Sequence, residues 1–174
     1  MGKPKNIQKK DLVHAAKQQL LSQGQGNVTL KSVADAAGVT QGVIYYHFKT
    51  KQQLLLSLIE QYEEELEKQV LVGQSLKDTL TKEMYNSQIS SDNQRFLTEL
   101  AALSFNHKEL KQRLGQAMRK RIQLYSEVME GKKLHGRLLT ALIDGLALQS
   151  VMDPTFPERE MYQLALEVLD ALEE

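Results

Sequence analysis

Residues 29–51, TLKSVADAAGVTQGVIYYHFKTK, read as two short helices joined by a tight turn, and they decide the fold. In the first helix, apolar residues recur at i, i+3, i+4 and i+7, the spacing of one helix face; they are Leu30, Val33, Ala34 and Ala37. Thr29 precedes this helix and is expected to cap it through its hydroxyl oxygen. Gly38 follows the last periodic residue, where a left-handed conformation ends a helix at no steric cost to glycine. The stretch therefore predicts a helix-turn-helix.

The second helix of the motif has few residues to bury. Thr40 is expected to cap it, and Val39 to pack against Ile44 as a hydrophobic staple. Its core-facing residues are predicted to be Ile44 with part of Val43, Tyr45 and Phe48, and its outward residues Gln41, Gly42, Tyr46 and His47. Such groups approach a base edge or a phosphate closely, and none of them repels a polyanion. The pattern favours DNA binding over the alternative, a small helical hairpin whose aromatic residues are only core.

The longer string TLKSVADAAGVTQGVIYYHFKTKQQLL resembles the DNA-binding domain of TetR-type (TetR/AcrR-like) bacterial transcriptional regulators. The matching features are the turn at Ala37-Gly38, the glycine Gly42, the run from Ile44 to Phe48, and Lys51 with the leucines that follow it. The resemblance covers about the first third of the chain. It implies an all-helical homodimer, a second domain that senses a small-molecule effector, and transcriptional repression by binding an inverted-repeat DNA operator.

The resemblance also implies roles for residues that match the family motif. Candidates for base edges or groove walls are Lys31, Gln41, Gly42, Val43 and Tyr46. Candidates for phosphate contacts are Thr29, Thr40, Tyr45, His47 and Lys51. A glutamine can bond adenine N6 and N7 together, whereas a lysine on a phosphate carries no sequence information.

Charge is distributed unevenly along the chain. The 174 residues have a net charge of zero, but residues 1–55 hold eight lysines against two aspartates, and the remainder carries the compensating negative charge. A basic segment that coincides with a helix-turn-helix is the expected footprint of a nucleic-acid domain. The chain has no cysteine, no apolar segment typical of a signal peptide and no run that could span a membrane. We therefore expect a cytoplasmic protein.

The rest of the chain has the period of helices and no strand-like alternation. The fold class we expect is all-α with about nine helices: a DNA-binding domain over residues 1–50 and a ligand-binding and dimerisation domain over residues 51–174. The predicted helices outside the motif span residues 8–23, 51–72, 75–88, 92–106, 108–129, 133–152 and 158–172, with a turn at residues 24–27.

The last two predicted helices have the composition of an association surface. Small residues such as Ala141 and Gly145 allow close helix approach on the first, and an apolar stripe that includes Leu164 and Val168 follows the second. Two helices from each of two subunits can close a four-helix bundle with twofold symmetry. The alternative is packing within one chain only.

The resemblance also implies a ligand pocket in the second domain. The helices that surround the ligand in the family carry these candidates here: Tyr62, Met84, Phe96, Leu100, Leu103, Met118, Ile122, Tyr125 and Leu142. Aromatic and methionine side chains line adaptable apolar sites, so a small, mostly apolar ligand is expected. The same residues would also serve as ordinary core. The basic residues between Arg113 and Arg121 could read an anionic ligand, although a solvated helix face is the expectation for them.

Catalysis finds no support in the sequence. The four histidines lack metal-ligand spacing, and there is no nucleophile elbow, Walker loop or nucleotide fingerprint. No metal or cofactor is expected. Asp144 stands out as a carboxylate in an apolar helix, and we expect it to be a paired structural residue. Two further classes stay open: a helical ligand carrier without DNA contacts, and an architectural DNA-binding protein without sequence preference or effector.

Overall fold

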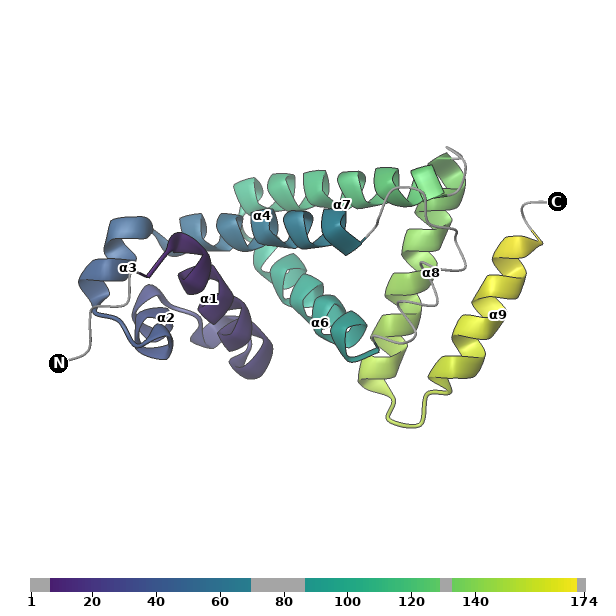
Figure 1. Cartoon of the computed structure of the whole chain (residues 1–174), viewed down its shortest axis with the longest axis horizontal. Helices are drawn as coiled ribbons and strands as arrows, with labels where there is room; N and C mark the ends of the chain where they lie inside the picture. The colour runs from purple at the N-terminus through teal and green to yellow at the C-terminus, as the bar shows by residue number, and fades with distance from the viewer. Residues whose placement is uncertain (1–6, 70–86, 129–132, 172–174) are drawn as a thin grey trace. The chain divides into compact units, whose positions relative to one another are not determined.

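The computed structural model describes residues 7–69, 87–128 and 133–171 (Figure 1). Within those ranges the regular secondary structure is entirely helical, which confirms the all-α fold class. The elements are α1 (Lys9–Gln23), the 3₁₀ turn η1 (Gln25–Asn27), α2 (Leu30–Ala37), α3 (Gln41–His47), α4 (Lys51–Gln69), α6 (Ser87–Ser104), α7 (Lys108–Val128), α8 (Lys133–Met152) and α9 (Glu158–Asp170). None of the helices in these ranges is long and apolar enough to cross a membrane.

The chain divides into two compact units. The first holds the described residues up to Tyr62 together with Thr98–Leu114, and the second holds those of Glu63–Leu97 and Gly115–Glu174. Helices α4, α6 and α7 therefore each contribute to both units. The expected domain boundary at residue 50 stays a prediction.

Helices α1, α2 and α3 pack together at the start of the first unit, α1 on α2 and α2 on α3. Their shared interior consists of fully buried apolar residues: Leu12, Ala16, Leu20, Val28, Val33, Ala34, Ile44 and Phe48. The Thr29 cap is confirmed, because its hydroxyl oxygen accepts from the Ser32 N–H at 3.0 Å while Ser32 Oγ accepts from the Thr29 N–H at 2.9 Å. Gly38 is left-handed, with φ 67° and ψ 34°, so the predicted turn of the helix-turn-helix is also confirmed.

The cap predicted for α3 is wrong. Thr40 occupies the N-cap position with extended backbone angles, but its side chain makes no capping hydrogen bond. The Val43 N–H, which a capping hydroxyl would satisfy, instead donates to the Thr40 carbonyl at 3.0 Å. Because the backbone already satisfies that donor, the Thr40 hydroxyl is left on the surface.

The boundary predicted before α6 is also wrong. The helix begins at Ser87 and not at Asp92. Of the helix expected over residues 75–88, residues 75–86 lie outside the described residues. The cluster from Ser90 to Asn93 has the composition of a helix start. Such residues cost at most about 0.7 kcal/mol each inside a helix relative to alanine, which the burial of Phe96 and Leu100 further along α6 can offset.

In the second unit, α8 and α9 lie side by side and antiparallel (Figure 1). They share a small apolar cluster of Leu146, Tyr162 and Ala165, against which Leu142, Phe156 and Met161 pack. Helix α8 also approaches α7 closely: a Cβ added at Gly136 would lie 2.7 Å from the Ser126 Cα and would overlap its hydroxyl. The bounds of α8 agree with the prediction, and α9 begins where predicted.

Candidate nucleic-acid interface

Helix α3 is attached to the core by two side chains and exposes most of the others. Ile44 and Phe48 are fully buried, whereas Tyr46 is 78% exposed and Tyr45 is 46% exposed. Gln41 and Gly42 are exposed as well, and Val43 and His47 are half-buried. The Tyr46 and His47 rings meet edge to face, with centroids 5.1 Å apart. The predicted outward face is thus present at Gln41, Gly42 and Tyr46, with His47 half-buried and Tyr45 more exposed than predicted, and it carries no negative charge.

Two threonine hydroxyls and a lysine amine lie near the starts of α2 and α3. Thr29, Thr40 and Lys31 are all exposed. Capping uses the Thr29 oxygen as an acceptor, so its O–H still serves as a donor, and Thr40 makes no cap bond at all. These groups are chemically suited to phosphate oxygens.

Lys51 differs from the other candidates because it is tied to the protein. Its amine donates to the Gln25 carbonyl at 3.2 Å, and burial lowers the pKa of that amine. An ammonium carries three donors, so a phosphate contact remains chemically possible beside the carbonyl bond. The phosphate role of Lys51 therefore stays a prediction, and its bond to Gln25 is an additional structural role.

At the junction of α3 and α4, three residues that were not predicted as functional make polar contacts: Lys49, Thr50 and Gln53. The Lys49 amine donates to the Tyr45 carbonyl at 2.8 Å, at the end of α3. The Lys49 N–H donates to Gln53 Oε1 at 2.7 Å, and the Gln53 N–H donates to Thr50 Oγ1 at 3.2 Å. Thr50 and Gln53 stand three residues apart, which is the spacing of a capping box and was visible in the sequence.

The predicted ligand residues are not gathered in one unit. Tyr62, Leu100 and Leu103 belong to the first unit, and Phe96, Met118, Ile122, Tyr125 and Leu142 belong to the second. Tyr62, Phe96, Leu100 and Tyr125 are buried and the others are half-buried, apart from Met84, which lies outside the described residues. The ligand site stays a prediction.

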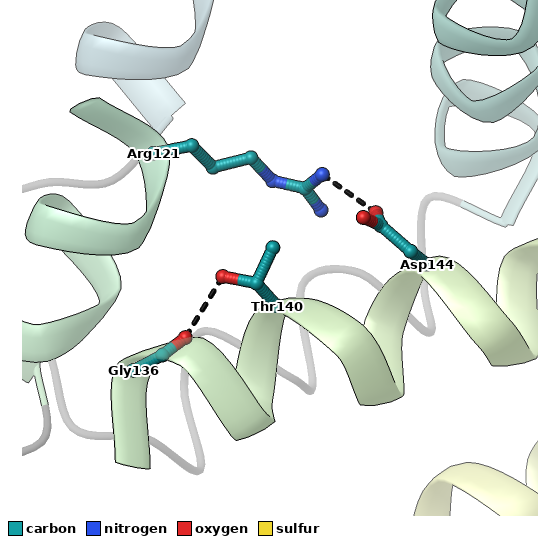
Figure 2. A network of polar contacts seen from close by, with 4 residues as sticks. All are labelled: Arg121, Gly136, Thr140 and Asp144. Carbon is teal, nitrogen blue, oxygen red and sulfur yellow. Dashed lines mark hydrogen bonds and ion pairs between the residues drawn. The ribbon is translucent and has the colours of Figure 1, made fainter. Parts of the chain in front are cut away.

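A buried ion pair joins α7 to α8 (Figure 2). Arg121 Nη1 lies 2.6 Å from Asp144 Oδ1, and the two side chains are 6% and 26% exposed. The guanidinium lies 5.3 Å from the centroid of the Tyr125 ring, and one turn before Asp144 the Thr140 hydroxyl donates to the Gly136 carbonyl at 2.8 Å. Asp144 is confirmed as a paired structural carboxylate.

The basic run on α7 is not one solvated face as expected. Arg119 is exposed and Lys120 pairs with Glu67 at 2.5 Å, but Arg121 points into the second unit. Three consecutive helical residues cannot share one face, because each is rotated by about 100° from the last. Elsewhere in the described ranges, no three His, Cys, Asp or Glu side chains gather as a metal site would require.

Residues 12–58, which run from α1 through α3 into α4, match the family described as bacterial regulatory proteins, tetR family. This segment of the chain is thus similar to the TetR family over its first helices. The ten candidate DNA-contacting residues all lie inside the matched segment.

Two similar proteins are described as regulators. The HTH-type transcriptional regulator TtgR of Pseudomonas putida is 36% identical over 53 residues, which are 30% of this chain and 25% of TtgR. This match therefore spans a quarter of its relative's length. The fatty acid metabolism regulator protein of Bacillus subtilis is 23% identical over 157 residues, covering 86% of this chain and 78% of that one.

The similarity in fold covers most of the chain. A crystal structure of a TetR-family transcriptional regulator from Rhodococcus sp. superposes with a TM-score of 0.77 at 18% identity, covering 95% of this chain and 98% of that one. Similarity at this identity establishes the fold. The family and these relatives are described as regulators and not as enzymes.

Proposed function

We propose that the protein is a transcriptional regulator that reads duplex DNA with α3. The observation that carries the proposal is the exposed face of α3, held in place by Ile44 and Phe48 within a TetR-type domain. A helix presented in this way enters a major groove, whose base edges distinguish all four base pairs. Gln41 then contacts base edges, with Gly42 allowing close approach of the backbone, and Thr29 and Thr40 bind phosphates.

The regulator acts as a twofold dimer. On α8 and α9 a set of large apolar side chains is exposed in the single chain: Leu138, Leu148, Val151, Met152, Leu164 and Val168. A Cβ added at Gly145 of α8 would meet nothing within 4 Å. Exposed apolar surface on two adjacent helices is suited to the same surface of a second copy, which would close a four-helix bundle. A dimer of this kind reads an inverted repeat.

Control by a small, mostly apolar effector completes the proposal, with repression in the absence of ligand. Two observations support it: the candidate ligand residues are aromatic and aliphatic, and the Bacillus relative that aligns with most of this chain regulates fatty acid metabolism. A regulator of transcription acts where the chromosome is, in the bacterial cytoplasm.

Selection of bound duplexes from a random pool tests the DNA-binding part of the proposal. A sequence-specific regulator enriches one inverted repeat, and its affinity falls steeply as salt increases because bound phosphates release counterions. An architectural DNA-binding protein would retain all duplexes equally, and a ligand carrier would retain none. Either of these last results contradicts the proposal.

The effector is tested separately, by a thermal-shift screen of small apolar compounds followed by affinity measurement with and without the selected duplex. A ligand that releases DNA prefers the DNA-free state, with a coupling of about 1–3 kcal/mol, and DNA must weaken ligand binding by the same factor. Equal ligand affinities in the two measurements would show that the ligand does not control DNA binding.

A further inference from the structure

The turn between α1 and α2 is held by two side chains from distant parts of the chain, all within the first unit. Glu99 of α6 accepts, through Oε2, a hydrogen bond from the Gln25 backbone N–H at 3.0 Å. The Gln25 carbonyl accepts a hydrogen bond from the amine of Lys51, at the start of α4, at 3.2 Å. Both bonds are partly buried, where a hydrogen bond is stronger than in water. Gln25 is therefore bound by its N–H to α6 and by its carbonyl to α4.

Gly24 fits the turn to the Glu99 carboxylate. Its φ is +73°, in the left-handed region that favours glycine. A Cβ at position 24 would also lie 3.5 Å from Glu99 Oε1, so the carboxylate lies directly against the turn. A further polar contact within the first unit joins Gln52 of α4 to Glu109 in the first turn of α7. The Glu99 carboxylate of α6 thus contacts the turn between α1 and α2, and the Glu109 carboxylate of α7 contacts α4.

We propose that Glu99 is a positioning residue for DNA binding. Its carboxylate fixes the Gly24–Gln25 turn and so sets how the packed body of α1, α2 and α3 is held on α6. Because α1 packs on α2 and α2 on α3, an angular change at this turn moves α3 with the rest. The effect on affinity rests on the proposed function, whereas the effect on geometry does not.

The geometric effect is measured without DNA. The chain has no cysteine, so cysteines introduced at the exposed positions Gln18 of α1 and Lys111 of α7 are unique sites for a pair of spin labels. Both positions lie in the first unit. Labelled protein is diluted with unlabelled protein so that distances within one chain dominate. The width of the distance distribution then reports how firmly α1 is held relative to the α6–α7 segment.

Three substitutions separate the hydrogen bond from other roles of the side chain. Glu99→Ala removes the acceptor, and Glu99→Gln retains a carbonyl oxygen that can accept the same bond. Gln25→Pro removes the donor from the other side; position 25 begins a 3₁₀ turn, where proline's fixed φ and missing N–H are tolerated. Glu64→Ala, on the exposed face of α4, is the control. Thermal melting confirms that each variant is folded at the assay temperature.

Glu99→Ala and Gln25→Pro should each broaden the distance distribution and weaken binding of the selected duplex about tenfold, as expected for loss of a hydrogen bond to a charged group. The double variant should show little more effect than either single variant, because both substitutions remove the same hydrogen bond. Glu99→Gln keeps an acceptor but loses the charge, so it should fall between Glu99→Ala and the wild type, whereas Glu64→Ala should behave like the wild type. The slope of affinity against salt should stay unchanged, since no phosphate contact is lost.

Two results would overturn the proposal. An unchanged distance distribution in Gln25→Pro and Glu99→Ala would show that the bond does not position the domain. If one of these two variants fails to fold, the distance distribution of the other variant decides. A broadened distribution with unchanged affinity would show that the position of the domain does not govern DNA binding. If the wild type selects no duplex at all, the proposed function fails, and the distance measurement still decides whether Glu99 positions the domain.

Discussion

At the scale of single residues, Gln41 of α3 is a group that can carry sequence information, whereas Lys51 of α4 can bind a phosphate but carries none. Gln41 is exposed at the start of the helix, and its amide can pair with an adenine edge, which discriminates by about 1–3 kcal/mol. Gln41→Ala should therefore relax the base preference at one position per half-site and leave the other positions unchanged. Repeating the duplex selection with the variant measures this, with Gln18→Ala on α1 as the control. A uniform loss of affinity, with the base preference intact, would show that Gln41 contacts the DNA phosphate backbone and not a base edge.

Lys51 has two candidate partners, and salt dependence distinguishes them. If its amine binds a phosphate, Lys51→Ala should weaken all duplexes alike and reduce the slope of log affinity against log salt by about 1. If it serves only the Gln25 carbonyl, affinity should fall with the slope unchanged. We expect the first result, because the ammonium retains two donors beyond that carbonyl bond. Titrations of one duplex at several salt concentrations make the comparison.

At the scale of elements, the contact between α7 and α8 depends on one glycine. A Cβ at Gly136 would overlap Ser126, including its backbone nitrogen and Cα, so Gly136→Ala forces the two helices apart. Overpacking of this kind costs about 1–3 kcal/mol of the free energy of unfolding. Gly115→Ala is the matched control in α7, since its Cβ would meet only Arg119 Nη1 at 3.5 Å and helix propensity favours alanine by about 1 kcal/mol. Urea denaturation of the two variants measures the difference, and equal stabilities would show that the helices separate without cost.

The ion pair in Figure 2 joins the same two helices by charge. Removing one partner leaves the other charge partly buried, so Arg121→Met and Asp144→Leu should each destabilise the fold, by up to about 3–5 kcal/mol. The Arg121→Met/Asp144→Leu double variant should recover much of that loss, since an apolar pair can replace a buried ion pair. Chemical denaturation of all four proteins gives the cycle. Additive losses would mean that the two residues act independently.

Helix ends were predictable from sequence where one residue type decides them. Thr29 and Gly38 are examples, because a capping hydroxyl and a left-handed glycine act locally. The start of α6 was not, because the cost of Ser90 to Asn93 inside a helix is smaller than the packing energy of more distant residues. The pairing of Arg121 with Asp144 joins residues 23 apart, and the Glu99–Gln25 bond joins residues 74 apart. No local pattern encodes such contacts. The exposed residues of α3 were predictable because they are what remains after Ile44 and Phe48 are buried.

At the scale of the whole molecule, assembly is expected to depend on α8 and α9. Gly145→Arg would place a bulky charge in the proposed helix contact between subunits, where its desolvation is costly. The variant should sediment as a monomer at micromolar concentration, whereas the wild type should sediment as a dimer. Gly26→Arg is the matched control, because a Cβ at Gly26 also meets nothing within 4 Å but the residue belongs to η1 and not to α8 or α9. A monomeric wild type would contradict the assembly outright.

The dimer and the recognition helix together constrain the operator. A twofold dimer presents two copies of α3, and both can enter the major groove on one face of the duplex only if the half-sites are separated by whole helical turns, about 34–36 Å or a multiple. Inserting five base pairs between the half-sites rotates one of them by about half a turn and takes it out of reach of its α3. Affinity should then fall to that of a single half-site with the same bases present. Titration of the selected duplex and of the half-turn insertion, at one salt concentration, measures the loss. Equal affinity for both duplexes would mean that each protomer binds its half-site independently, and the protein would then bind DNA as separate domains and not as one rigid pair.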